Sequence, residues 1–516
     1  MIEKVNFSKN YLKIYFWKIL SISSGFLSLL IVVPNLSSDM ELYGIYSLCI
    51  SFTLYLSYAD IGFLSAGQKY AAEAYARNNR IQEVEILGFT GAILLLMVIP
   101  FSFFMILLSF DPSIIINDLS ENGMKISSVL FLIIGTLLPL QIILQRLVQS
   151  ILIIRIKDYV FMRIELVFNL LKIGSVFYFF NEDSYMLIEY YFFICALTII
   201  SSTVILLIIK KNESYDFYFL FKSIKLRKKE FHLTKKLALS SFLLTIGWIL
   251  YFELDLIIIA KWFTPELVAI YAIGFTFLNF LRNLWNYVFS PFAQRFNHYS
   301  ALNYDSELKK LIEQIINFTL PLCIIVTLTL ILASDKIVYY WVGQNYKDSI
   351  LILQVLIAGT CFGFVTNPAS YFFIAKTKYN YLNLLSVILP LTFFLALFAL
   401  IPNFDVLGVS ISKTLTMFIG FIIYFVGLKS FYNPFISIKK TYLELIIISF
   451  VLIFLVPYIL ETLFASNVKS TINLILLLIT LFIIIIFSYL IILFSNKEMK
   501  RDFKVILSNF NNEKRK

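Results

Sequence analysis

Long apolar runs recur along most of this 516-residue chain, and they limit the folds that it can adopt. Hydrophobic residues make up 60% of the chain and charged residues only 15%, which is too little charge to cover a soluble protein of this length. Many runs exceed about 18 residues, the length at which a helix crosses a bilayer. The apolar residues are continuous rather than alternating, which disfavours a transmembrane β-barrel. The sequence therefore predicts an all-α, polytopic membrane protein.

The apolar runs predict about fourteen transmembrane helices. The first run follows Lys4, Lys9 and Lys13, as in a signal peptide, but it is about 20 residues long and no small-residue cleavage site follows it. Because fourteen is even, both termini should lie on one side, and the segments between spans, including 66–85, should be loops. The predicted spans are 14–34, 43–65, 86–109, 126–150, 160–180, 187–209, 237–259, 268–292, 310–333, 349–374, 381–401, 406–428, 441–461 and 470–494.

The distribution of Lys and Arg residues indicates which side faces the cytoplasm. With the N-terminus inside, 32 of the 43 Lys and Arg residues fall in cytoplasmic segments, 5 in outer loops and 6 within spans. Cytoplasmic loops of membrane proteins carry such an excess. Both termini are therefore expected to be cytoplasmic, and this topology explains most of the formal charge of +11 without a nucleic-acid partner.

Three short segments of the first half recur in the second half, in the same order and at offsets of 224 to 226 residues. Such repetition indicates that a six-helix unit was duplicated. Because six is even, both repeats would insert the same way round, with a central cavity between them. Spans thirteen and fourteen lie outside the repeat. The matching segments are 41–46 with 266–271, 67–70 with 293–296, and 132–136 with 356–360.

The repeat divides the chain into five parts. The 210–236 linker is basic with interleaved aromatic residues. This composition favours a linker held at the anionic inner leaflet over specific lipid or nucleic-acid recognition, although both interpretations stay open. The expected parts are an N-terminal six-helix half at 1–209, the cytoplasmic linker at 210–236, a C-terminal six-helix half at 237–428, two extra transmembrane helices at 429–494 and a basic cytoplasmic tail at 495–516.

Several cationic side chains fall within the predicted spans, where each costs roughly 2.5–3.5 kcal/mol at mid-membrane. Lys18 and Arg146 lie near span ends, where a long side chain can reach the interface instead. Lys172 shares a helical face with Glu165, so an internal ion pair is an alternative to a ligand site there. The guanidinium of Arg282 suits phosphate oxygens, which it binds as a fork. The candidate substrate-binding residues are Arg282, Lys172, Arg146, Lys413, Asn283 and Asn286.

Acidic side chains within the spans are candidates for binding a coupling ion. Glu253 and Asp255 lie close together in span seven, and two such acids can hold a proton or bind Na⁺. Pairing with a Lys or Arg of another span is the alternative for these two acids. Glu165 is the third candidate, with an ion pair inside its own span as the alternative. Asp60, near the end of span two, is as well explained as an anchoring residue.

The sequence carries no expected catalytic, cofactor or metal site. The four Cys residues lie in apolar spans without paired spacing, and both His residues lie in polar loops. No GxxxxGK[ST] motif for ATP binding is present.

Short motifs in both halves resemble a known family. In the first half they are Tyr43–Ser47, Tyr58–Gly62 and Lys69–Glu73, and in the second half Leu267–Tyr271 and Pro291–Gln294. The chain resembles the O-antigen and capsule repeat-unit flippases, which are polysaccharide-biosynthesis proteins of the multidrug/oligosaccharidyl-lipid/polysaccharide exporter superfamily. The resemblance implies two six-helix bundles around a cationic cavity, alternating access and an ion gradient. It also implies a polysaccharide polymerase and a chain-length regulator as partners.

The expected function is therefore a flippase of the bacterial inner membrane, which makes and breaks no bond. Its cargo would be an undecaprenyl-diphosphate-linked oligosaccharide for O-antigen, lipopolysaccharide, capsule or exopolysaccharide, and H⁺ or Na⁺ would be coupled. A multidrug exporter of the same fold is an alternative that the positive charge within the spans disfavours. An O-antigen polymerase is disfavoured by the short outer loops, and an uncoupled scramblase stays open.

Overall fold

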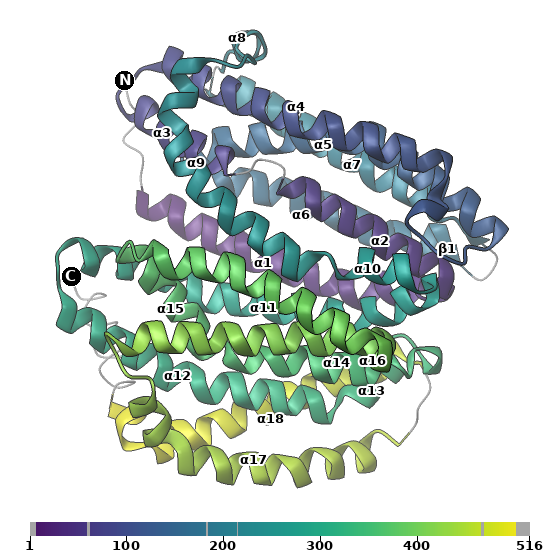
Figure 1. Ribbon diagram of the computed structural model, residues 1–516, viewed down its shortest axis with the longest axis vertical. Helices are drawn as coiled ribbons and strands as arrows, with labels where there is room; N and C mark the ends of the chain where they lie inside the picture. The colour runs from purple at the N-terminus through teal and green to yellow at the C-terminus, as the bar shows by residue number, and fades with distance from the viewer. Residues whose placement is uncertain (1–6, 59–61, 182–183, 214, 466–468, 502–516) are drawn as a thin grey trace. The chain divides into compact units, whose positions relative to one another are not determined.

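The chain is almost entirely helical, which confirms the predicted all-α fold class (Figure 1). It divides into two compact units. The N-terminal unit comprises Met1–Ile249 and Glu253–Ala269, and the C-terminal unit comprises Leu250–Phe252 and Ile270–Lys516. The domain limits predicted from the repeat stay a prediction. The computed structural model describes residues 7–58, 62–181, 184–213, 215–465 and 469–501.

The N-terminal unit contains the first ten α-helices and a short antiparallel hairpin in which Phe180 pairs with Tyr185. A π-helix at Ile249–Glu253 joins α9 to α10. The elements are α1 (Phe7–Leu36), α2 (Met40–Ser57), α3 (Phe63–Ala76), α4 (Arg80–Phe110), a 3₁₀ turn (Pro112–Ile114), α5 (Glu121–Ile154), α6 (Asp158–Phe179), β1 (Phe180–Asn181), β2 (Ser184–Tyr185), α7 (Leu187–Glu213), α8 (Phe217–Lys222), α9 (Lys228–Trp248) and α10 (Asp255–Trp262).

The C-terminal unit contains the rest, including most of α11. Its elements are α11 (Pro265–Ala301), α12 (Asp305–Leu332), α13 (Ser334–Trp341), a 3₁₀ turn (Gln344–Tyr346), α14 (Ser349–Ala358), a 3₁₀ turn (Gly359–Phe362), α15 (Gly363–Ala375), α16 (Tyr379–Lys429), α17 (Phe435–Leu463) and α18 (Thr471–Ser495).

Ten helices within the described ranges are long and apolar enough to cross a membrane, so the chain is a multi-pass membrane protein. The exact count of fourteen stays a prediction. Helix α16 shows why the counts differ, because its 51 residues cover two predicted spans, 381–401 and 406–428. Its backbone departs from helical geometry at Asp405, where φ is 46° and ψ is −133°. The stretches on either side of this residue pack against one another, since a Cβ at Gly420 would lie 3.2 Å from Leu389 Cδ2 and one at Gly427 3.0 Å from Tyr381 Cε1.

The prediction that residues 66–85 form a loop is wrong. Residues 66–76 belong to helix α3, and α4 begins at Arg80. The buried face of α3 consists of small residues such as Ala66, Gly67 and Ala71, in an Ala-rich segment with high helix propensity. Small side chains give a weak hydropathy signal, so the pattern of long apolar runs did not reveal this helix.

Helices α4, α5 and α7 lie side by side in the N-terminal unit (Figure 1). The hydroxyl of Ser102 on α4 donates to the carbonyl of Gly135 on α5. A Cβ at Gly135 would lie 2.7 Å from Ile106 Cγ1, so only glycine permits this close approach. Small residues allow membrane helices to pack at short distance in this way. These three helices carry the ion network described below.

The segment from 217 to 235, which we call the α8–α9 elbow, is folded rather than extended. It contains all of α8 and the first two turns of α9. The Asp216 carboxylate caps α8 by accepting a hydrogen bond from the backbone N–H of Phe219. Phe217 and Leu220 are buried in a core that also includes Ile86, Ile151 and other residues of α4, α5 and α7.

In the C-terminal unit, α12 is packed against α14, α15, α17 and α18 (Figure 1). The two helices beyond the repeat are therefore attached to this unit. The phenol of Tyr489 on α18 donates to the carbonyl of Phe318 on α12 across 3.1 Å. The backbone N–H of Ser470 donates to the carbonyl of Tyr340 at the end of α13, across 3.2 Å.

Candidate functional site

The C-terminal unit places two of the predicted substrate-binding cations on one aromatic ring. Lys413, on α16, has no exposed surface, and its Nζ lies 4.2 Å from the centroid of the Phe252 ring. The guanidinium carbon of Arg282, on α11, lies 4.3 Å from the same centroid. The Lys413 ammonium also lies 4.4 Å from the ring of Phe275. Cations favour the electron-rich face of an aromatic ring, and this attraction strengthens where water is excluded.

A backbone carbonyl completes this Phe252 cluster. The Lys413 ammonium donates to the carbonyl oxygen of Phe252 across 2.6 Å. Phe252 lies near the end of the π-helix, and residues at the end of a helix leave carbonyls without an intrahelical donor. Lys413 therefore donates to a carbonyl near the end of the π-helix. In this conformation its ammonium faces protein atoms rather than solvent.

The asparagines predicted to accompany Arg282 differ in their environment. Asn283 and Asn286 are exposed on α11, whereas Arg282 and Asn279 are half-buried. The side-chain oxygen of Asn279 is buried and accepts no hydrogen bond from the described residues. The stretch of α11 around Arg282 thus combines one guanidinium with exposed amide groups, which can accept and donate hydrogen bonds to a polar ligand.

In the N-terminal unit, the predicted coupling residue Glu253 is held by aromatic hydrogen-bond donors. Its carboxylate oxygen Oε1 lies 3.3 Å from Trp248 Nε1 and 3.3 Å from the Tyr58 hydroxyl. The hydroxyl of Tyr55 donates to the backbone carbonyl of Glu253. Glu253 is 3% exposed and Asp255 is fully buried. The sequence identified both acids, but not Tyr55 of α2 and Tyr58 at the C-cap of that helix, which contact Glu253.

The predicted pair on α6 is tied to α7. The Lys172 ammonium donates to Thr198 Oγ1 across 2.7 Å, and the Glu165 carboxylate accepts from the Ser201 hydroxyl across 2.8 Å. The shared face that the spacing predicted is therefore directed at one neighbouring helix. Each charge bonds to a hydroxyl of that helix, whereas an ion-pair ladder along α6 was the alternative.

The remaining predicted residues belong to α5, to α1 and to the segment after α2. Arg146 is half-buried on α5. Gln141, on the same helix, has a buried side-chain oxygen that accepts no hydrogen bond from the described residues. Lys18 is half-buried on α1. Asp60 lies outside the described residues.

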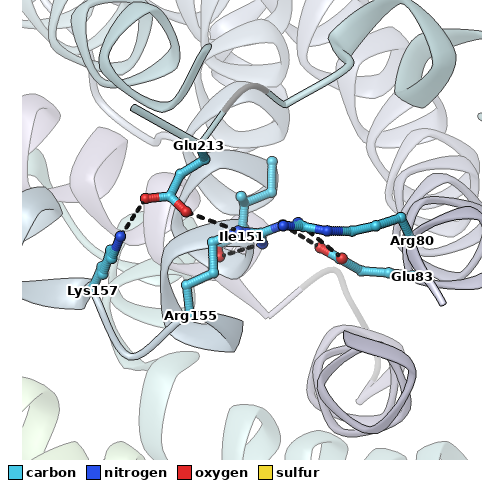
Figure 2. A network of polar contacts seen from close by, with 6 residues as sticks. All are labelled: Arg80, Glu83, Ile151, Arg155, Lys157 and Glu213. Atoms are coloured by element: carbon cyan, nitrogen blue, oxygen red, sulfur yellow. Dashed lines mark hydrogen bonds and ion pairs between the residues drawn. The ribbon is translucent and has the colours of Figure 1, made fainter. Parts of the chain in front are cut away.

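A network of buried ions, absent from the sequence predictions, joins α4, α5 and α7 (Figure 2). Arg155 and Glu83 have fully buried side chains, and Arg155 Nη2 lies 2.7 Å from Glu83 Oε1. Glu213 lies 3.6 Å from Arg155 Nε and 2.6 Å from Lys157 Nζ. Arg80, whose side chain is 53% exposed, lies 3.5 Å from the second oxygen of Glu83. The network holds the predicted cytoplasmic ends of three helices together.

Two tyrosines cover the central guanidinium of this network. The guanidinium carbon of Arg155 lies 4.8 Å from the ring centroid of Tyr75 and 5.0 Å from that of Tyr215. Burial, reinforced by the nearby Glu83 carboxylate, raises the pKa of the Tyr215 phenol above its usual value, so this phenol stays neutral. Arg155 is one of the cytoplasmic Lys and Arg residues of the predicted topology, and its buried partner Glu83 lies 72 positions away in the chain.

Among the described residues, no group of three or more His, Cys, Asp or Glu side chains is placed to hold a metal ion.

No family model matches the chain, and no curated protein matches it. Several solved structures, however, are similar to the chain. The lipid II flippase MurJ, in an inward closed conformation, is similar with a TM-score of 0.64 and 16% identity, covering 94% of this chain and 97% of that chain.

An inward-facing multidrug resistance transporter of the MATE family and MOP superfamily is also similar. Its TM-score is 0.58 and its identity 11%, covering 80% of this chain and 94% of that chain. At such identities the similarity establishes a shared fold, and function has to be argued from the residues themselves. The chain is thus a multi-pass membrane protein. More particularly, it has the fold that MurJ and the MATE transporter share.

Proposed function

We propose that this protein is a flippase for lipid-diphosphate-linked oligosaccharides. It would move undecaprenyl-diphosphate-linked repeat units of O-antigen, capsule or exopolysaccharide from the inner to the outer leaflet of the bacterial inner membrane. The observation that carries the proposal is the pair of cations, Arg282 and Lys413, around the Phe252 ring within membrane helices. Charges at such depth are costly and usually serve a ligand or pathway. An anionic diphosphate is a ligand that these two cations could bind.

The residues of α11 would contact the cargo first. Arg282 is half-buried and can present two donors to phosphate oxygens, while the exposed Asn283 and Asn286 can bind sugar hydroxyls. Lys413 is fully covered and would reach the cargo only after a rearrangement, as alternating access requires. Lys172 and Arg146 would add positive charge on the N-terminal unit. MurJ, named as a lipid II flippase, supports this class of cargo through its fold.

Transport would be coupled to H⁺ or Na⁺ through the buried carboxylates Glu253, Asp255 and Glu165. The indole of Trp248 and the phenol of Tyr58 donate to the Glu253 carboxylate and add no formal charge beside it. The protein would place both termini in the cytoplasm, perform no chemical reaction and supply a polysaccharide polymerase and a chain-length regulator with substrate.

Deletion of the gene in its host, followed by complementation, tests this proposal. We expect the deletion to abolish surface polysaccharide and to accumulate lipid-linked repeat units on the cytoplasmic side. Wild type and Arg295→Ala, an exposed site on the same helix, should restore the polymer. Arg282→Ala should restore less than about a tenth of it at normal expression, since a charge-assisted hydrogen bond contributes roughly 1.5–3 kcal/mol.

Other outcomes of that experiment would contradict the proposal. Repeat units that cross the membrane but stay unpolymerised would indicate a polymerase. Unchanged polysaccharide together with altered drug resistance would indicate a multidrug exporter, which the MATE fold favours as the second candidate. The cationic residues of the C-terminal unit disfavour that candidate, because they would repel a cationic drug.

A further inference from the structure

The α8–α9 elbow is held firmly against the N-terminal unit. Phe217 and Leu220 are buried in its core. Arg227 Nη1 lies 2.5 Å from Glu85 Oε1 of α4. The backbone of Ser223 approaches Gly88 so closely that a Cβ there would lie 2.4 Å from the Ser223 carbonyl oxygen. The elbow therefore presents a defined outer surface rather than a flexible linker.

That outer surface combines large apolar side chains with lysines. Tyr218 is 78% exposed, Phe221 49% and Leu226 61%. The only acid between residues 217 and 235, Glu230, is 3% exposed. Every exposed formally charged side chain of the elbow is therefore cationic. These cations are Lys222, Lys225, Lys228, Lys229 and Lys235.

The position of the elbow in the chain places this surface at the membrane. It joins α7 to α9, and the Lys and Arg distribution assigns their connecting end to the cytoplasmic side. Aromatic side chains favour the level of the lipid headgroups, and lysines beside them attract anionic lipids. Amphipathic segments of this composition lie in the interface plane.

We propose that the outer surface of the elbow binds anionic phospholipids of the cytoplasmic leaflet. The lysines contact the headgroup phosphates, while Tyr218, Phe221 and Leu226 insert beside the acyl chains. A soluble acidic protein would explain the lysines but would leave these three apolar side chains without a matching environment. The inference is independent of the transported cargo, because it rests on a surface outside the clusters around Phe252 and Glu253.

Lipid retention by the purified full-length protein tests the proposal. The protein is equilibrated in micelles with equal amounts of phosphatidylglycerol and phosphatidylcholine, and bound lipids are counted by native mass spectrometry. We expect the ratio of bound phosphatidylglycerol to phosphatidylcholine to fall about tenfold in the K222Q/K225Q/K228Q/K229Q variant. The matched control K309Q/K310Q removes two exposed lysines of α12 and should keep the wild-type ratio.

Two further measurements separate the contributions. Raising the ionic strength from about 0.1 M to about 1 M shortens the Debye length from about 10 Å to about 3 Å and should abolish the preference of wild type. Y218S/F221S should retain less of both lipids while preserving their ratio. An unchanged ratio in the four-lysine variant, or an equal loss in the α12 control, would overturn the proposal. Each variant should elute from gel filtration as a single peak at the wild-type position, which is the check that it is folded.

Discussion

Arg155→Ala should lower the stability of the protein by about 3–5 kcal/mol, because it leaves a buried carboxylate without its cation. Both side chains of the Arg155–Glu83 pair are 0% exposed, and the atoms lie 2.7 Å apart. Glu213 would keep its contact with Lys157 at 2.6 Å. The loss of stability should therefore come mainly from the Glu83 carboxylate, which is left buried beside no Arg155 guanidinium. The measurement is thermal unfolding in detergent, followed by tryptophan fluorescence at a fixed scan rate.

Two variants show whether burial is the cause of that loss. Arg80 also contacts Glu83, but its side chain is 53% exposed, so Arg80→Ala should cost less than about 1 kcal/mol. Replacing both partners, as Arg155→Met with Glu83→Met, should recover much of the stability lost in Arg155→Ala, since no uncompensated charge remains. Equal losses of stability in Arg155→Ala and Arg80→Ala would contradict the explanation that burial of the Arg155–Glu83 pair causes the loss.

Lys413→Met should lower the rate of transport about 10- to 100-fold. The substitution removes a charged donor from the Phe252 carbonyl, 2.6 Å away, and a cation from two aromatic rings. A hydrogen bond from a charged group contributes roughly 1.5–3 kcal/mol. If the Lys413 hydrogen bond forms in only one state of the transport cycle, its loss changes the transport rate by about 10- to 100-fold. Lys413→Arg keeps the charge and donors and should retain more activity.

The measurement for Lys413 is the rate at which surface polymer reappears after induced expression in the deletion strain, normalised to protein in the membrane. Lys309→Met, at an exposed position on α12, serves as the control for loss of one lysine. Wild-type rates in Lys413→Met would show that the Phe252 cluster has no part in transport.

The apolar runs sufficed to predict the fold class, because each membrane helix must satisfy its backbone polar groups internally and be apolar outside. They failed at α3, whose buried face is made of alanine and glycine and carries little hydropathy signal. They predicted 381–401 and 406–428 as two spans, and these residues are two helical stretches that meet at the non-helical Asp405 and pack against one another.

Spacing along one helix predicted part of the candidate site. Glu165 and Lys172 share a face because they lie seven residues apart, and both indeed face α7. Which hydroxyls they bind was beyond prediction, since Thr198 and Ser201 belong to another helix. The same limit applies to Lys413 and Phe252, which are 161 positions apart, and to Arg155 and Glu83, which are 72 apart. Such pairs become visible only when the helices are packed together.

The most direct test of the proposed function is translocation by the purified protein in proteoliposomes. An undecaprenyl-diphosphate oligosaccharide is placed in both leaflets, and a membrane-impermeant glycosidase reports how much lies outside over time. We predict that an imposed H⁺ or Na⁺ gradient moves the inner pool outward with wild-type protein, and that Arg282→Ala abolishes this movement while Arg295→Ala preserves it. Equal rates in wild-type, Arg282→Ala and protein-free vesicles would contradict the account.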